Sequence, residues 1–267
     1  MIKKLINFTI IGRFFYLANP IVNRFGFSGS VKKIINNLGS KLSVKFKNND
    51  IQDYLRNKPV LLISNHPFMF GIVALIASIP QRSDSHLIIN SDYLNVYPNL
   101  DKFLIPVYIR HQNYGNWYEK ILKLLFDKIF FYPSYNSDVE HQKNIKSIDD
   151  AVNKIKKGEL VIIFPEKRDQ KLRWYKGVGY LIRNLGSSVK YHIIFAHLGG
   201  NSRRLDYLRL FPHIGKILSP ISINFSECLT LNKVLSKNND PEQISLELQK
   251  EYEIWAKSLN MIGSSIV

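Results

Sequence analysis

Two polar segments that follow apolar runs carry the side chains best suited to acid–base chemistry. The run Val60–Ser64 is followed directly by Asn65 and His66, and the run Leu160–Phe164 leads to Glu166. Polar residues at the carboxyl ends of such strands lie where open α/β sheets place their active sites. A histidine with an ordinary pKa of about 6.5 can accept a proton near neutral pH. The first segment alone is better explained by a structural histidine, and the second segment is the reason to consider a functional one.

A dense group of basic residues follows Glu166. Five cations lie between residues 167 and 176, and Gly177 and Gly179 come next. Cations beside a backbone that can be approached closely indicate a phosphate site, whereas the cations in isolation would fit a solvated loop. The cations are Lys167, Arg168, Lys171, Arg173 and Lys176.

The segments that must position these residues alternate between strands and helices. Several of the apolar runs are continuous, which is typical of strands buried on both faces of a parallel sheet. The alternation predicts an α/β fold with a mostly parallel central sheet flanked by helices. The predicted strands are Val60–Ser64, His86–Asn90, Leu104–Ile109, Leu160–Phe164, Tyr191–His197 and Ile217–Phe225.

Three segments show the spacing of amphipathic helices. One begins with a capping-box pattern at Ser147 and ends at Gly158. A second covers residues 117–129. The third begins at Asp240, which is followed by a first-turn proline, and its apolar face includes Tyr252.

The first fifty residues differ from the rest of the chain. We expect an N-terminal helical appendage over residues 1–50 and an α/β domain over residues 51–267. The apolar start is interrupted by Arg13 and ended by Pro20, so it is shorter than the roughly 20 residues of a spanning helix. It also lacks the small-residue cleavage site of a signal peptide. Two interpretations stay open, an interfacial helix lying on a membrane and a helix that packs on the domain.

The charge of the chain is unusual for its composition. Lys and Arg total 37 against 21 for Asp and Glu, which gives a net charge of +16. Such a field favours an anionic partner, although a genome-wide bias toward lysine would also produce it. No nucleic acid partner is expected, because the basic residues do not alternate with stacking aromatics. The single Cys228 excludes an internal disulfide, and no zinc-ligand spacing predicts a metal site.

The motifs resemble, in order and approximate separation, those of the glycerophospholipid acyltransferase family, which includes the lysophosphatidate acyltransferases. The family's first motif, Asn-His-x-x-x-x-Asp, is similar to Asn65-His66-Pro67. Its third motif, Phe-Pro-Glu-Gly-x-Arg, is similar to Phe164-Pro165-Glu166, and a following Lys-x-Gly segment is similar to Lys176-Gly177. A middle motif would end at Arg110, and a last apolar strand would cover His192–Ala196. The resemblance spans about residues 58–200.

The chain departs from the family pattern at the acid of the first motif. Gly71 stands where the family has the aspartate that orients the histidine. In a Ser-His-Asp triad, loss of the orienting acid lowers turnover by about 10⁴. Candidate replacements are a backbone carbonyl, the substrate, or a carboxylate such as Glu166, Asp84 or Asp92. In the other motifs, Lys167 replaces a glycine, the arginine is displaced to Arg168, and Ile109 replaces an aspartate.

The resemblance implies transfer of a fatty acyl group from acyl-CoA or acyl carrier protein to a hydroxyl of a lysophospholipid-like acceptor. It implies no metal and no cofactor beyond the acyl donor, and a location at the cytoplasmic face of the cell membrane, against an anionic surface. His66 and Glu166 would be catalytic. The alternative is a degenerate member that binds lipid without turnover. The implied substrate-binding residues are Asn65, Arg110, Lys167, Arg168, Lys176 and Gly177.

Overall fold

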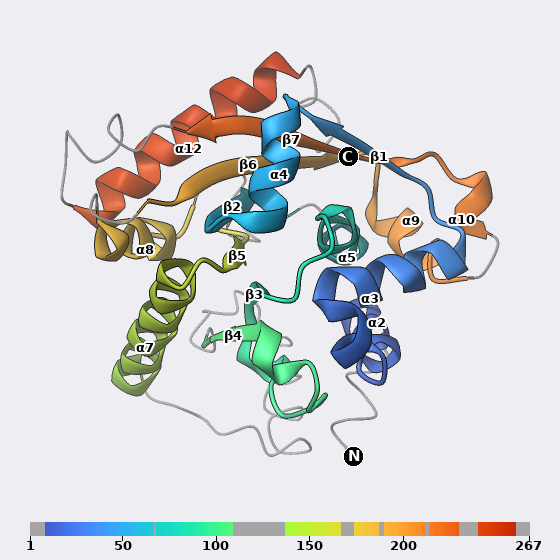
Figure 1. The fold of residues 1–267 in the computed structure, drawn as a ribbon, viewed down its shortest axis with the longest axis horizontal. Helices are drawn as coiled ribbons and strands as arrows, with labels where there is room; N and C mark the ends of the chain where they lie inside the picture. Colours follow the sequence, from blue (N-terminus) through green and yellow to red (C-terminus); the bar gives the residue numbers. More distant parts are fainter. Residues whose placement is uncertain are drawn as a thin grey trace, which may run out of the picture.

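A seven-stranded sheet forms the centre of the molecule in the computed structural model (Figure 1). The model describes residues 9–66, 68–108, 137–166, 174–186, 190–211, 214–229 and 240–259. The strand order is β1-β7-β6-β2-β5-β3-β4, and the paired strands are parallel except for the antiparallel pair β6 and β7. The predicted α/β class with a mostly parallel sheet is therefore confirmed. The strands are β1 Leu42–Phe46, β2 Val60–Ser64, β3 Ser85–Asn90, β4 Leu104–Val107, β5 Leu160–Ile163, β6 His192–Gly199 and β7 Ile221–Leu229.

Helices cover both faces of the sheet (Figure 1). On one face lie α2 Ile10–Ala18, α3 Val22–Leu38, α4 Asn49–Asn57 and α5 Met69–Ser78. On the other face lie α7 Ser137–Lys156, α8 Gly177–Leu185 and α12 Pro241–Ser258. Shorter helices are η1 Ser91–Tyr93, η2 Asp101–Phe103, α9 Arg203–Leu208 and α10 Ile214–Ile217.

Strand β2 shows why its sequence is continuously apolar. Val60 and Leu62 belong to the core that contains α2, α3 and α5, whereas Leu61 and Ile63 belong to the core that contains α7, α8 and α12. Successive side chains of a strand point to opposite faces, so a strand between two helical layers needs apolar residues at every position.

The N-terminal fifty residues contribute to the same core and the same sheet. Phe14 and Phe15 of α2 are buried among the side chains of that core, and Leu42–Phe46 pairs in parallel with β7. Phe14 and Phe15 therefore pack on the domain and are not available to a membrane. Tyr16 and Leu17 remain exposed on the outer side of α2.

Two elements start several residues away from their predicted first residue. The expected strand Ile217–Phe225 begins only at Ile221, and Ile217 ends helix α10 with 86% of its side chain exposed. Pro220 cannot donate a hydrogen bond to a sheet, which explains why strand pairing starts after it. Helix α7 begins at Ser137 rather than at Ser147, whose hydroxyl donates to the Lys143 carbonyl one turn earlier. The predicted helix over residues 117–129 lies outside the described residues.

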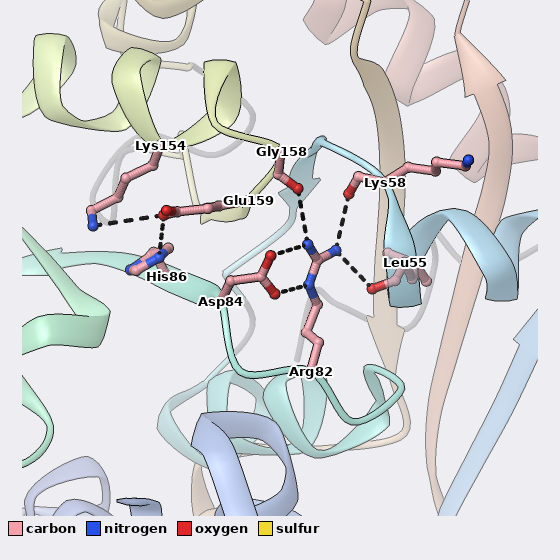
Figure 2. A network of polar contacts seen from close by, with 8 residues as sticks. All are labelled: Leu55, Lys58, Arg82, Asp84, His86, Lys154, Gly158 and Glu159. Atoms are coloured by element: carbon pink, nitrogen blue, oxygen red, sulfur yellow. Dashed lines mark hydrogen bonds and ion pairs between the residues drawn. The ribbon is translucent and has the colours of Figure 1, made fainter.

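Arg82 ties together the amino ends of three neighbouring strands (Figure 2). Its guanidinium makes a bidentate pair with Asp84 at 2.6 and 2.7 Å and donates to the carbonyls of Leu55, Lys58 and Gly158. These partners come directly before, or close to the start of, β2, β3 and β5. This contact fixes the amino edge of the sheet, opposite the edge that carries His66.

Candidate active site

The predicted base and the predicted carboxylate meet at the carboxyl edge of the sheet. Strands β2 and β5 are parallel neighbours in which Ile63 is paired with Ile163, so the segments that follow them emerge side by side. The backbone N–H of His66 donates to the Glu166 carboxylate at 2.9 Å. The His66 ring lies edge-on to the Phe164 ring, with 5.4 Å between the ring centroids.

Glu166 is held in a poorly solvated position. Burial raises the pKa of its carboxyl group, and the hydrogen bond from the His66 backbone offsets part of that rise. The backbone of Glu166 forms an antiparallel bridge with Trp174, and the Tyr175 N–H donates to the Pro165 carbonyl at 2.8 Å. Trp174 and Tyr175 therefore lie beside the carboxylate that contacts His66.

Asn65 is directed away from solvent and toward strand β6. It is 5% exposed, and its amide donates to the Leu198 carbonyl at 3.0 Å and accepts from the Leu198 N–H at 2.8 Å. These two hydrogen bonds continue the pairing of β2 with β6 beyond the last strand residue. The side chain of Asn65 thereby fixes the direction in which the backbone enters His66.

A buried tyrosine and a second histidine contact the end of strand β2 next to His66. The Asn65 backbone N–H donates to the Tyr252 hydroxyl, which lies 2.6 Å from Nδ1 of His197. Burial and the nearby Glu166 raise the pKa of Tyr252, and burial lowers the pKa of His197 to about 4. In the sequence, Tyr252 belongs to a predicted helix face and His197 to a predicted strand, and nothing in the local pattern separates them from ordinary core residues.

The candidate replacements for the missing motif acid lie in different places. Gly71 is buried in the first turn of α5 and has no side chain to contribute. Asp84 lies at the opposite edge of the sheet, paired with Arg82 (Figure 2). Asp92 lies in η1 beyond the carboxyl end of β3, where it contacts Asn90. Of these carboxylates, Glu166 has a hydrogen bond to His66, through the backbone N–H.

The basic candidates are described only in part. Lys176 is exposed and directly precedes helix α8, whose first residue is Gly177. Gly179 is needed for packing, because a Cβ atom there would overlap the backbone of Pro241 in α12. Arg110, Lys167 and Arg168 lie outside the described residues. Within the described part of the chain, no group of three or more His, Cys, Asp or Glu side chains could hold a metal ion.

The crystal structure of the 1-acyl-sn-glycerophosphate (LPA) acyltransferase PlsC from Thermotoga maritima is similar over 93% of this chain and 94% of its own, with a TM-score of 0.45 and 13% identity. No protein-family model matches the chain, and no curated protein matches it in sequence. No helix within the described ranges is long and apolar enough to cross a membrane.

Proposed function

We propose that this protein is an acyltransferase that moves a fatty acyl group from a thioester donor to a hydroxyl of a lysophospholipid or related phosphorylated lipid. The observation that carries the proposal is the contact between His66 and Glu166 at the carboxyl edge of the sheet. It supports the proposal because acyl transfer to a hydroxyl requires a base at a partly open position, held by fixed neighbours.

His66 acts as the general base in this reaction. The imidazole takes the proton of the acceptor hydroxyl while that oxygen attacks the thioester carbonyl carbon. The tetrahedral intermediate then collapses, the carbon–sulfur bond breaks, and the imidazolium returns the proton to the leaving thiolate. Atoms and charge balance without a metal, and such a base contributes about 10²–10⁴ to the rate.

The acceptor phosphate is bound by the basic residues around the site. Lys176 stands at the start of α8, and the free N–H groups at a helix start favour an anion. Lys167 and Arg168 belong to the segment that begins after Glu166 and ends before Trp174, and Arg110 follows the end of β4. In this proposal acyl-CoA or acyl carrier protein is the donor, and no other cofactor takes part.

The protein works at an anionic membrane surface, on the cytoplasmic face, from which a lysophospholipid is taken. The exposed side of α2 carries Arg13, Tyr16 and Leu17, which combine a cation with apolar groups as an interfacial helix does. The net charge of +16 favours the same surface.

A second candidate function follows from Gly71. Because the first turn of α5 carries no carboxylate of its own, the fold could bind a lipid at the same edge without turning it over. Vesicle or lipid binding without acyl transfer, across many thioester donors, selects this alternative.

The test replaces His66 by alanine and assays acyl transfer with a panel of thioester donors and lysophospholipid acceptors. We expect turnover to fall by about 10²–10⁴. The matched control is His141→Ala, since His141 is exposed on α7, and this variant should retain wild-type turnover. Unchanged turnover in a folded His66→Ala protein would exclude His66 as the base. If the wild type is inactive and Gly71→Asp gains activity, the natural protein is the degenerate binder.

A further inference from the structure

A carboxylate from a distant element caps the helix that follows His66. The N–H groups of Met69 and Phe70 in the first turn of α5 donate to the side chain of Asp206 in α9, at 3.2 Å for Phe70. The cap residue of α5 itself is Phe68, whose side chain has no acceptor atom. The first N–H groups of a helix need partners from outside the helix, and side-chain oxygens are the usual ones.

The capping carboxylate is buried at some cost. Asp206 is 3% exposed, and its partners besides α5 are the Asn201 amide and the charge of the fully buried Arg209. Arg209 in turn donates to Asn201 and to the carbonyls of Gly200 and Ser219. A simple N-cap needs no buried carboxylate, since a serine or asparagine at position 68 would serve.

The segment from His66 to Phe70 is thus held at both ends by carboxylates. Glu166 accepts from the N–H of His66, and Asp206 accepts from the N–H groups of Met69 and Phe70. The two acids lie 100 and 136 residues further along the chain than their partners. The backbone is therefore anchored at His66 and again at the start of α5 by side chains from distant elements.

We propose that Asp206 is the positioning residue of the His66 site and that it acts through the first turn of α5. Gly71, in this same turn, offers no carboxylate. The inference rests on the proposed function of His66 for its catalytic consequence. The claim that Asp206 fixes the placement of the His66 ring can be tested without an assay of turnover.

The test compares Asp206→Asn and Asp206→Ala with Asp84→Asn. Asparagine keeps an acceptor oxygen and nearly the same volume, whereas alanine removes the acceptor altogether. Asp84→Asn is the matched control, because it makes the same change in an aspartate at the opposite edge of the sheet, where Asp84 pairs with Arg82 (Figure 2). Thermal unfolding of each variant gives the folded fraction, so that rates are expressed per folded molecule.

In an active protein we expect Asp206→Ala to lower kcat by about tenfold to a hundredfold, with KM changed by less than about threefold, because a misplaced base slows chemistry more than binding. Asp206→Asn keeps the acceptor and should stay within about threefold of the wild-type kcat, and Asp84→Asn within about twofold. Should Asp206→Ala fail to fold, Asp206→Leu, which also lacks the acceptor, supplies the same comparison. Wild-type kcat in a folded variant that lacks the acceptor overturns the proposal.

If the wild type turns over no pair of donor and acceptor, the proposed catalytic function of His66 is wrong. The positioning role of Asp206 is then tested by two other measurements. Hydrogen exchange of the Met69 and Phe70 amides should be faster in Asp206→Ala, and the NMR signals of the His66 ring should move. Both should match the wild type in Asp84→Asn. Unchanged exchange and unchanged ring signals in a folded Asp206→Ala or Asp206→Leu protein overturn the positioning role.

Discussion

At the scale of single residues, some contacts of the site could be predicted from the sequence and others could not. The meeting of His66 and Glu166 could be predicted, because both follow apolar runs and the carboxyl ends of parallel strands share one edge. Asp206, His197 and Tyr252 could not be predicted. They reach the site from elements whose placement depends on tertiary packing, and each occupies a position that fits a plain helix or strand pattern.

His197 provides a prediction about pH. Burial lowers its pKa from 6.5 to about 4, so between these values the unfolded chain binds a proton that the folded protein does not. The stability that depends on neutral His197 is therefore complete above about pH 6.5 and is lost as the pH falls toward about 4. Chemical denaturation at pH 7 and pH 4.5 should show this loss in the wild type.

The variant His197→Gln isolates that contribution. It should reduce the difference in unfolding free energy between the two pH values by about 2–3 kcal/mol, because glutamine does not titrate. His141→Gln on the exposed side of α7 serves as the control and should leave the difference unchanged. An equal pH dependence in wild type and His197→Gln would mean that His197 does not stay neutral in the folded protein.

At the scale of elements, strongly apolar strands were predicted more accurately than mixed ones. Strand β2 was predicted with its bounds, since burial on both faces leaves no polar position. Strand β1, at the edge of the sheet, was not predicted, because Ser43 and Lys45 interrupt its apolar residues. The early start of α7 was not predicted either, since its first two turns are almost entirely polar.

The contact between α8 and α12 gives a prediction at this scale. Gly179→Ala should destabilise the protein by about 3 kcal/mol, because the added methyl group would overlap the Pro241 backbone and the two helices must separate. Gly177→Ala is the matched control on the same helix. No atom lies within 4 Å of its added Cβ, so we expect stability to rise slightly, by up to about 1 kcal/mol.

Denaturant unfolding of the two glycine variants checks this difference. Equal stability of Gly179→Ala and Gly177→Ala would show that α8 and α12 are not in close contact. An acyl-transfer assay of Gly177→Ala adds a test of the phosphate site, because Gly177 begins the helix whose N–H groups are proposed to bind the acceptor.

At the scale of the whole molecule, the charge and the two faces of the sheet bear on the proposed membrane partner. The apolar groups proposed for the interface, Tyr16 and Leu17, are exposed on α2, which belongs to one helical layer. Ile254 is exposed on α12, which belongs to the other layer. A chain of net charge +16 alone would attract an anionic bilayer without preferring either layer.

Vesicle sedimentation separates a general attraction from a defined interface. The double variant Tyr16→Ser with Leu17→Ser should bind anionic vesicles about tenfold more weakly, because two apolar side chains no longer enter the bilayer. Ile254→Ser should bind within about twofold of the wild type, since the same kind of change falls on the opposite layer. Binding should weaken as salt is raised above about 0.1 M, where charges are screened beyond about 10 Å. Equal loss in the α2 and α12 variants would mean that charge alone brings the protein to the membrane and that α2 is not the side that meets it.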